Sequence, residues 1–221
     1  MLDTTLFQGF DPSQIAAIHA THSAELVENG KATANKSAQR HLMRRAKAER
    51  TLADILPARF EHGDSWHVIS HGDIDALSYL RHALAGVTHF DHVLLSTWCI
   101  AKPDIDELKT WLDSGRIDQL DFYVGEIFPN QYGDEYEQAL RMADIYGARL
   151  VIAKNHSKVT LASHHQSDYH LAIESSANVN TNPRIEQSTI HCNKDIVAFY
   201  RDFYHGLRSI DRASKPPRHA S

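Results

Sequence analysis

The stretch of sequence at 154–187, KNHSKVTLASHHQSDYHLAIESSANVNTNPRIEQ, decides the fold. It contains two strand-like runs, at 156–163 and 168–175, joined by the polar HHQS, and this pattern predicts a β-hairpin. The run SSANVNTNPR that follows is dense in turn-forming residues. A last short strand at 186–193 and a closing helix at 194–210 are then expected, the helix because of its spaced aliphatic and aromatic residues.

Upstream of this hairpin, from about residue 65, strand and helix patterns alternate. Strands are expected at 65–70, 90–100, 117–125 and 148–153, and helices at 72–86, 102–115 and 133–147. In the first of these helices Asp73 is expected near the N-cap and Gly86 at the end. Three helices alternating with strands imply right-handed crossovers. The sequence therefore predicts an α/β fold with a mixed, largely parallel sheet flanked by helices.

The first 60 residues have a different character, with helices expected at 12–30 and 31–56. Basic residues dominate positions 31 to 50, where Glu49 is the single acid; they are Lys31, Lys36, Arg40, Arg44, Arg45, Lys47 and Arg50. A basic helix is a solvated face in most proteins, and in some it contacts nucleic acid or phosphate. We expect a helical, basic extension over 1–60, an α/β domain over 61–210 and a flexible tail over 211–221.

The bulk composition is that of an ordinary globular protein. The 221 residues suffice for one sizeable core, with 42% hydrophobic and 23% charged residues. The formal charge of −5 argues against a protein that is basic all over. Cys99 and Cys192 lie far apart, so we expect no disulfide framework. The N-terminus lacks a signal-peptide pattern, and no apolar run approaches the roughly 20 residues of a membrane span. These features predict a soluble, cytoplasmic protein.

His156 and Lys158 are the first candidates for chemistry. On a strand, residues i and i+2 face the same side, so these two side chains are expected to project together. An imidazole beside a fixed ammonium suits an anionic, phosphate-like substrate. The lysine stabilises charge that builds in the transition state, while the histidine supplies the reacting nitrogen.

Further polar candidates follow the hairpin. In the turn at 175–178 and just after it, Ser176, Asn178 and Asn180 are candidates to meet a phosphoryl oxygen. Glu186, at the start of the next strand, is placed to accept a hydrogen bond from the His156 imidazole and so to fix its tautomer. Trp98 is expected near the carboxyl end of a strand, the usual ligand side of a parallel sheet. It is either a core residue or a platform on which a substrate stacks.

A zinc site is the competing interpretation of this histidine-rich region, which contains His164, His165 and His170 and, further on, His191 and Cys192. Adjacent histidines at a hairpin tip point to opposite faces, and neither a Cys-x-x-Cys nor a His-Glu-x-x-His spacing occurs. The sequence therefore predicts no metal ligands and no cofactor.

His156 and Lys158, a Ser-rich turn ending in Asn178, and the downstream Glu186 resemble, in that order, the phospholipase D superfamily. The order of strands and helices from about residue 65 to 208 also looks like that fold. The family's Asp, expected five residues after the lysine, is here Ser163. Asp168, Glu174 or no residue at all takes its place.

The resemblance implies a mechanism. Family members build one active site from two His-Lys-Asn sets; one histidine attacks phosphorus to form a phosphohistidine, and the other protonates the leaving oxygen and then activates water. A chain with one set implies a homodimer, with His156 of each subunit meeting across a two-fold axis. The implied activity is that of a metal-independent phosphodiesterase, most of all a nuclease, with the basic helix from Arg40 to Arg50 helping to hold the polyanion.

Two other functions remain open at this stage. One is a nucleic-acid-binding or scaffold protein that keeps the fold without turnover. The other is a phospholipase or a transferase that uses the same phosphohistidine chemistry.

Overall fold

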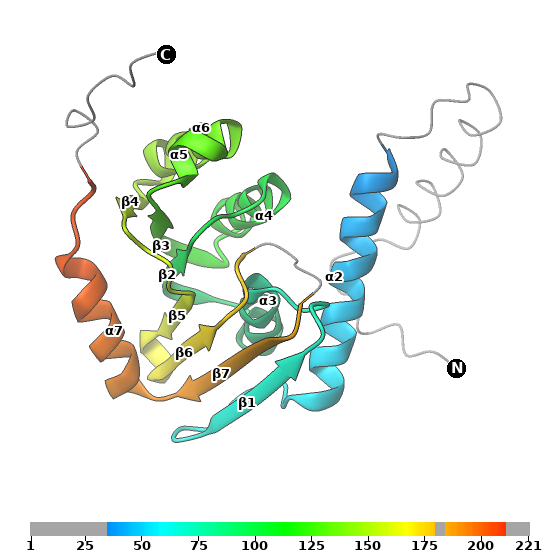
Figure 1. Ribbon diagram of the computed structural model, residues 1–221. Helices are drawn as coiled ribbons and strands as arrows, with labels where there is room; N and C mark the ends of the chain where they lie inside the picture. The colour runs from blue at the N-terminus through cyan, green and yellow to red at the C-terminus, as the bar shows by residue number, and fades with distance from the viewer. Residues whose placement is uncertain (1–34, 180–183, 211–221) are drawn as a thin grey trace, which may run out of the picture. The chain divides into compact units, whose positions relative to one another are not determined.

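The computed structural model describes residues 35–179 and 184–210 of the chain (Figure 1). Contacts divide the chain into Met1–Arg44 and Arg45–Ser221, and the second unit contains the sheet. The helix expected at 12–30 and the tail expected at 211–221 lie outside the described residues, so the domain limits proposed from the sequence stay predictions. No helix in the described ranges is both long and apolar enough to cross a bilayer.

Within the described residues, seven strands form one sheet in the order β1-β7-β6-β5-β2-β3-β4. They are β1 (Ser65–Ser70), β2 (Phe90–Thr97), β3 (Ile117–Gly125), β4 (Arg149–Ala153), β5 (Val159–His164), β6 (Tyr169–Ser175) and β7 (Glu186–Cys192). The pairs β2–β3 and β3–β4 are parallel, and the other four neighbouring pairs are antiparallel. The mixed α/β fold is thus confirmed, whereas the expectation of a largely parallel sheet is wrong.

The sheet is less parallel than expected because of the position that the hairpin takes in the strand order. Four successive antiparallel steps separate β1 from β2, so β1, β2, β3 and β4 all run in the same direction, as the crossover argument requires. However, β5, β6 and β7 lie between β1 and β2. A short loop such as η2 (His165–Ser167) can only join antiparallel neighbours, and this makes the predicted hairpin antiparallel.

The described residues form six α-helices: α2 (Asn35–Ile55), α3 (Ala76–Val87), α4 (Lys102–Asp113), α5 (Phe128–Gln131), α6 (Gly133–Tyr146) and α7 (Lys194–Gly206). One face of the sheet packs on the larger core, to which α3, α4 and α6 contribute apolar side chains. The helix α7 lies on the other face (Figure 1). Its Val197 and Tyr204 belong to a second cluster of buried side chains, together with Leu94, Tyr123 and Leu161. Both cysteines are buried thiols.

The ends of α3 differ from the sequence-based expectation. The N-cap is Asp75, whose Oδ1 accepts a hydrogen bond from the Ser78 amide at 2.8 Å, and not Asp73. Gly86 lies inside the helix, which ends at Thr88 with a φ of 70°. A Cβ on Gly86 would lie 1.7 Å from the Ala58 carbonyl oxygen, so glycine is needed here for a close backbone approach rather than as a helix stop.

The basic residues of α2 are partly engaged with acids of their own chain. Arg45 forms ion pairs with Asp104 at 2.7 Å and with Glu107 at 3.1 Å, and only 16% of its side chain is exposed. Lys47 pairs with Asp73 at 2.5 Å. The charge of Arg45 is therefore largely used within the chain, whereas 64% of the Lys47 side chain is exposed and Arg44 and Arg50 are exposed too. The contact of this helix with a polyanion stays a prediction. The side chains of Lys36 and Arg40 lie outside the described residues.

Candidate active site

His156 and Lys158 lie in the loop at 154–158 between β4 and β5, and not on a strand as expected, since β5 begins at Val159. The cause is Asn155. Its buried side chain accepts hydrogen bonds from the backbone amide and the hydroxyl of Ser157, at 3.1 and 2.6 Å. The opposite end of the same amide donates to Ser96 Oγ at 2.9 Å. These bonds hold the loop in a turn, which delays the start of the strand.

Asn155 is a site-shaping residue that the sequence analysis missed. Its side-chain nitrogen also donates to the Tyr123 carbonyl at 3.2 Å, so one amide joins the loop to both β2 and β3. An Asn two residues after the end of an apolar strand and two residues before a Ser is a signal for such an Asx turn. The neighbouring His-x-Lys pattern instead predicted that the strand already includes His156.

The loop still brings the two candidate side chains together. Lys158 Nζ lies 3.1 Å from His156 Nδ1 and donates to the His156 carbonyl oxygen at 2.6 Å. His156 is exposed, whereas Lys158 is buried with 8% of its surface accessible. Burial lowers the pKa of the Lys158 ammonium below its ordinary value, and the Glu186 carboxylate opposes that effect. The pair thus consists of an accessible imidazole and a sheltered cation.

Trp98 forms a wall next to the imidazole. The ring centroids of Trp98 and His156 are 5.6 Å apart with an interplanar angle of 59°. The Trp98 backbone amide donates to Asn178 Oδ1 at 3.3 Å, and this hydrogen bond connects Trp98 to the turn after β6. Gly125 makes room for the indole, because a Cβ at this position would lie 2.5 Å from Trp98 Cδ1.

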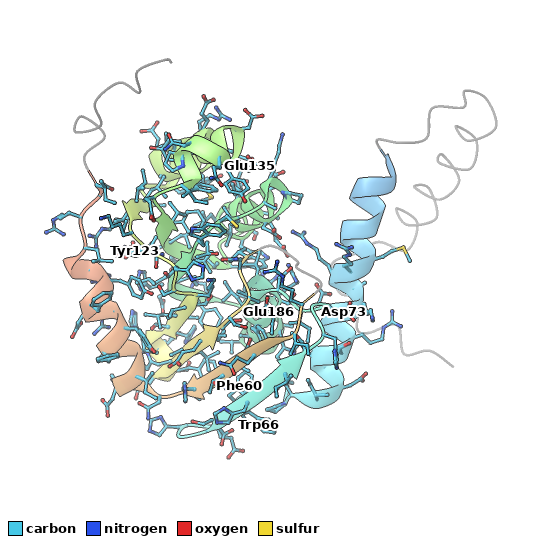
Figure 2. All side chains as sticks on the ribbon, viewed as in Figure 1. Phe60, Trp66, Asp73, Tyr123, Glu135 and Glu186 are labelled. Atoms are coloured by element: carbon cyan, nitrogen blue, oxygen red, sulfur yellow. The ribbon has the colours of Figure 1, made fainter. Side chains whose placement is uncertain are left out.

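The Ser-rich turn closes the site from the β6 and β7 side. The Ser175 amide donates to the Lys158 carbonyl at 2.9 Å, and the Ser176 amide donates to the Gln187 carbonyl at the same distance. The Ser176 hydroxyl donates a short hydrogen bond to Glu186, which stands at the start of β7 (Figure 2). These contacts place the turn beside the backbone of the His-x-Lys loop.

Six of the seven predicted site residues are therefore linked by contacts or electrostatic interactions at one end of the sheet: His156, Lys158, Trp98, Ser176, Asn178 and Glu186. Asn180 lies outside the described residues. Glu186 faces Ser176 and Lys158, and its expected hydrogen bond to the His156 imidazole stays a prediction.

Ser163, which replaces the acid of the family signature, lies toward the opposite end of β5 from Lys158. It is 4% exposed, and its hydroxyl is 3.1 Å from His170 Nδ1. His170 Nε2 is in turn 3.0 Å from Asp168, which also pairs with Lys194 at 2.7 Å. Asp168 thus acts at the hairpin end and does not substitute for the missing acid beside His156. Because Ser163 and His170 are both buried, this chain of hydrogen bonds is structural.

Glu174, the other acid considered for that role, lies across from Val159 in the β5–β6 ladder. Its carboxylate is 3.7 Å from His191 Nε2.

A hollow of about 520 Å³ lies elsewhere, between α4 and α6, and is lined by residues that include Lys102, Asp106 and Arg141. None of the candidate residues lines it, so we base the site on the convergence of side chains rather than on this hollow. His156 itself is exposed, so a large substrate or a second protein chain can reach its imidazole.

Comparisons with known proteins support the fold. No protein-family model matches the sequence, and no curated protein matches it either. Among solved structures, the fold is similar to that of the polyphosphate kinase from Porphyromonas gingivalis, with a TM-score of 0.50 and 18% identity. The match covers 69% of this chain and 27% of that one, so the chain spans about a quarter of the kinase.

A second structure, of the archaeal chromatin protein TrmBL2, described as showing a novel mode of DNA binding, matches with a TM-score of 0.48 and 10% identity. That match covers 91% of this chain and 72% of TrmBL2. Its TM-score is too low to support an argument. The kinase match thus supports the mixed α/β fold and assigns no residue a role.

Proposed function

We propose that this chain is a phosphodiesterase of the phospholipase D superfamily, acting as a metal-independent nuclease through His156. The observation that carries the proposal is the 3.1 Å approach of Lys158 Nζ to an exposed His156 imidazole. The same loop is bordered by Trp98 and by the Asn178 turn. His156, Lys158 and Asn178 follow one another in the chain order of the family signature.

The proposed reaction begins with attack by a His156 ring nitrogen on phosphorus. A nitrogen–phosphorus bond forms as the bond from phosphorus to the leaving oxygen breaks, and a proton from the second histidine goes to that oxygen. Lys158 stabilises the negative charge on the non-bridging oxygens. Asn178 Oδ1 already accepts from Trp98, so its amide nitrogen is the end that would donate to the phosphate. Water, deprotonated by the second histidine, then displaces the His156 nitrogen and releases the phosphomonoester.

The second histidine of this scheme is His156 of another subunit. The exposure of His156 supports an active site that is completed by a homodimer. A nucleic-acid substrate is supported by Trp98, whose partly buried indole can stack on a base while Lys158 meets the backbone.

The test is cleavage of single- and double-stranded DNA in the presence of EDTA. His156→Ala and Lys158→Ala should each reduce the rate on the order of 100-fold or more. His67→Ala, which removes another exposed histidine, should retain full activity and serves as the matched control. Labelled substrate should also leave an acid-labile, base-stable phosphoryl group on the wild type and none on the His156 variant. Unchanged cleavage by His156→Ala would rule out the proposal.

A second candidate is a nucleic-acid-binding protein without turnover. It is favoured by the buried Ser163 at the position of the family's acid, and by the engagement of Asp168 with His170 and Lys194. The same experiment separates the two functions. Salt-sensitive DNA binding without cleavage, and without a trapped phosphohistidine, would support this second function.

A further inference from the structure

Three side chains from separate elements converge under the C-terminal end of α7. His92 comes from β2, Asp121 from β3 and His205 from the last turn of α7. His92 Nε2 lies 3.3 Å and His205 Nε2 lies 3.1 Å from the same carboxylate oxygen, Asp121 Oδ2. The donor atoms of all three residues lie within 4.8 Å of one another. None of the three takes part in the candidate active site.

The hydrogen bonding of this cluster is incomplete. Asp121 is 2% exposed, and its second oxygen, Oδ1, has no hydrogen-bond partner. His92 Nε2 is also buried, and although it lies 3.3 Å from Asp121 Oδ2 it forms no hydrogen bond of adequate geometry. Buried polar atoms of this kind are nearly always satisfied in folded proteins, by another group, by water or by an ion. Here the unsatisfied atoms belong to two of the three residues whose possible ligand atoms lie within 4.8 Å of one another.

We infer that His92, Asp121 and His205 bind a divalent first-row transition metal, with zinc as the best match. Zinc takes imidazole nitrogens and carboxylate oxygens at about 2.0–2.2 Å, so the donor atoms of a tetrahedral site lie roughly 3.3 Å apart. The two nitrogen–oxygen distances in the cluster, 3.1 and 3.3 Å, agree with that spacing. Two imidazoles in a set of three ligands select such a metal over Mg²⁺ or Ca²⁺, which prefer oxygen.

The surroundings of the cluster fix one ligand and leave one coordination position open. Arg149 donates to the carbonyl oxygens of His205 and Leu207, at 3.2 and 2.7 Å, and this holds the backbone that carries the His205 imidazole. The His205 side chain is 44% exposed, so a fourth ligand, such as water, would enter from this side.

A second group of possible ligands, His89, Asp91 and Asp118, provides a contrast. The side chain of Asp118 is 59% exposed, and Asp91 Oδ2 already accepts a hydrogen bond from the His165 amide. Surface acids with solvent and backbone partners need no metal, so we assign no site there and use it as the internal control.

A metal at His205 would stabilise the candidate active site indirectly. The preceding residue, Tyr204, has its hydroxyl 2.6 Å from Ser157 Oγ, between the two candidate catalytic residues of the loop. The ion would fix the end of α7 to β2 and β3, and through Tyr204 it would fix the loop. This role is structural and does not depend on the proposed function.

The test uses the untagged full-length chain, stripped with EDTA and then dialysed. Titration with ZnCl₂ by calorimetry should show saturable binding and a rise in Tm, and Co²⁺ should give the visible absorption bands of a tetrahedral site. His205→Gln should weaken zinc binding on the order of 100-fold and abolish the rise in Tm, because it removes one of three protein ligands. His89→Ala should leave both measurements unchanged.

Several results would overturn the assignment: no saturable binding by the wild type, equal affinity in His205→Gln, or loss of binding in His89→Ala instead. Asp121→Asn should behave like His205→Gln where it folds. Because Asp121 is buried and His205 lies at the surface, the His205 variant decides the question even where the Asp121 variant does not fold.

Discussion

At the scale of single residues, the geometry of the candidate site depends on a glycine, Gly125. Gly125, the last residue of β3, lies against Trp98, and its amide donates to the Trp98 carbonyl at 3.3 Å. Trp98 in turn contacts both His156 and Asn178. The geometry of the site therefore requires that nothing larger than hydrogen occupies the Gly125 position.

Gly125→Ala tests this requirement. The new Cβ would lie 2.5 Å from Trp98 Cδ1, so the indole must shift, and we expect a loss of about 1–3 kcal/mol in the free energy of unfolding. Urea denaturation measures that loss, and tryptophan fluorescence reports the change around Trp98. Gly133→Ala is the matched control, since a Cβ there meets nothing within 4 Å and its φ is not positive. Equal stability of the two variants would show that Gly125 does not determine the position of the indole.

Residue patterns predicted which side chains converge at the candidate site, but not which residues hold them in place. His156, Lys158 and Asn178 were predicted from type and order, because these features are legible in a linear sequence. The role of Asn155 was not, since its partners Ser96 and Tyr123 lie 59 and 32 positions away and become neighbours only in the sheet. Similarly, the metal ligands proposed here come from three distant elements, so no spacing rule could detect them.

At the scale of secondary-structure elements, α7 does more than close the fold. Its Tyr204 is buried against Tyr123 and bonds through its hydroxyl to Ser157 in the loop between His156 and Lys158. Ser157 is also bound by Asn155 from the loop itself, at 2.6 Å. The loop is therefore held from two sides, and one of them is the closing helix.

Tyr204→Phe isolates the contribution of the helix. The substitution keeps the ring in the core and removes the hydroxyl, so we expect a loss of about 1 kcal/mol in unfolding free energy. We also expect faster hydrogen exchange confined to 154–158, measured by mass spectrometry, and a lower cleavage rate. Tyr200→Phe removes another hydroxyl of α7, one that interacts with Glu174 and not with the loop, and should leave exchange at 154–158 unchanged. Equal exchange in both variants would contradict the role assigned to Tyr204.

At the scale of the whole molecule, the elements were predictable and their order in the sheet was not. The hairpin, the alternation of strands and helices, and the closing helix all follow from local patterns of apolar and turn-forming residues. The placement of β7 against β1 rests on pairs such as Val68 with Ser188, which lie 120 residues apart. Local periodicity contains no information on such pairs, and this is why a correct set of strands led to an incorrect expectation of a largely parallel sheet.

The remaining molecular question is whether one site needs two chains. The chain has a single His-x-Lys followed by the Asn turn, and the proposed reaction needs two histidines. Because the subunits of a homodimer are equivalent, a chain carrying His156→Ala would inactivate every dimer that it joins. Activity should therefore fall with the square of the wild-type fraction.

Co-expression of differently tagged wild-type and His156→Ala chains in equal amounts measures this dependence. The proposed dimer predicts about one quarter of the cleavage rate of the same total amount of wild type, since random pairing leaves about one quarter of the dimers without the variant. Chains that act singly would retain about one half. A mixture of wild type with His67→Ala controls for expression and should show no loss. Light scattering should give twice the chain mass of 25.0 kDa; a monomer with one half of the activity would show that His156 acts without a partner subunit.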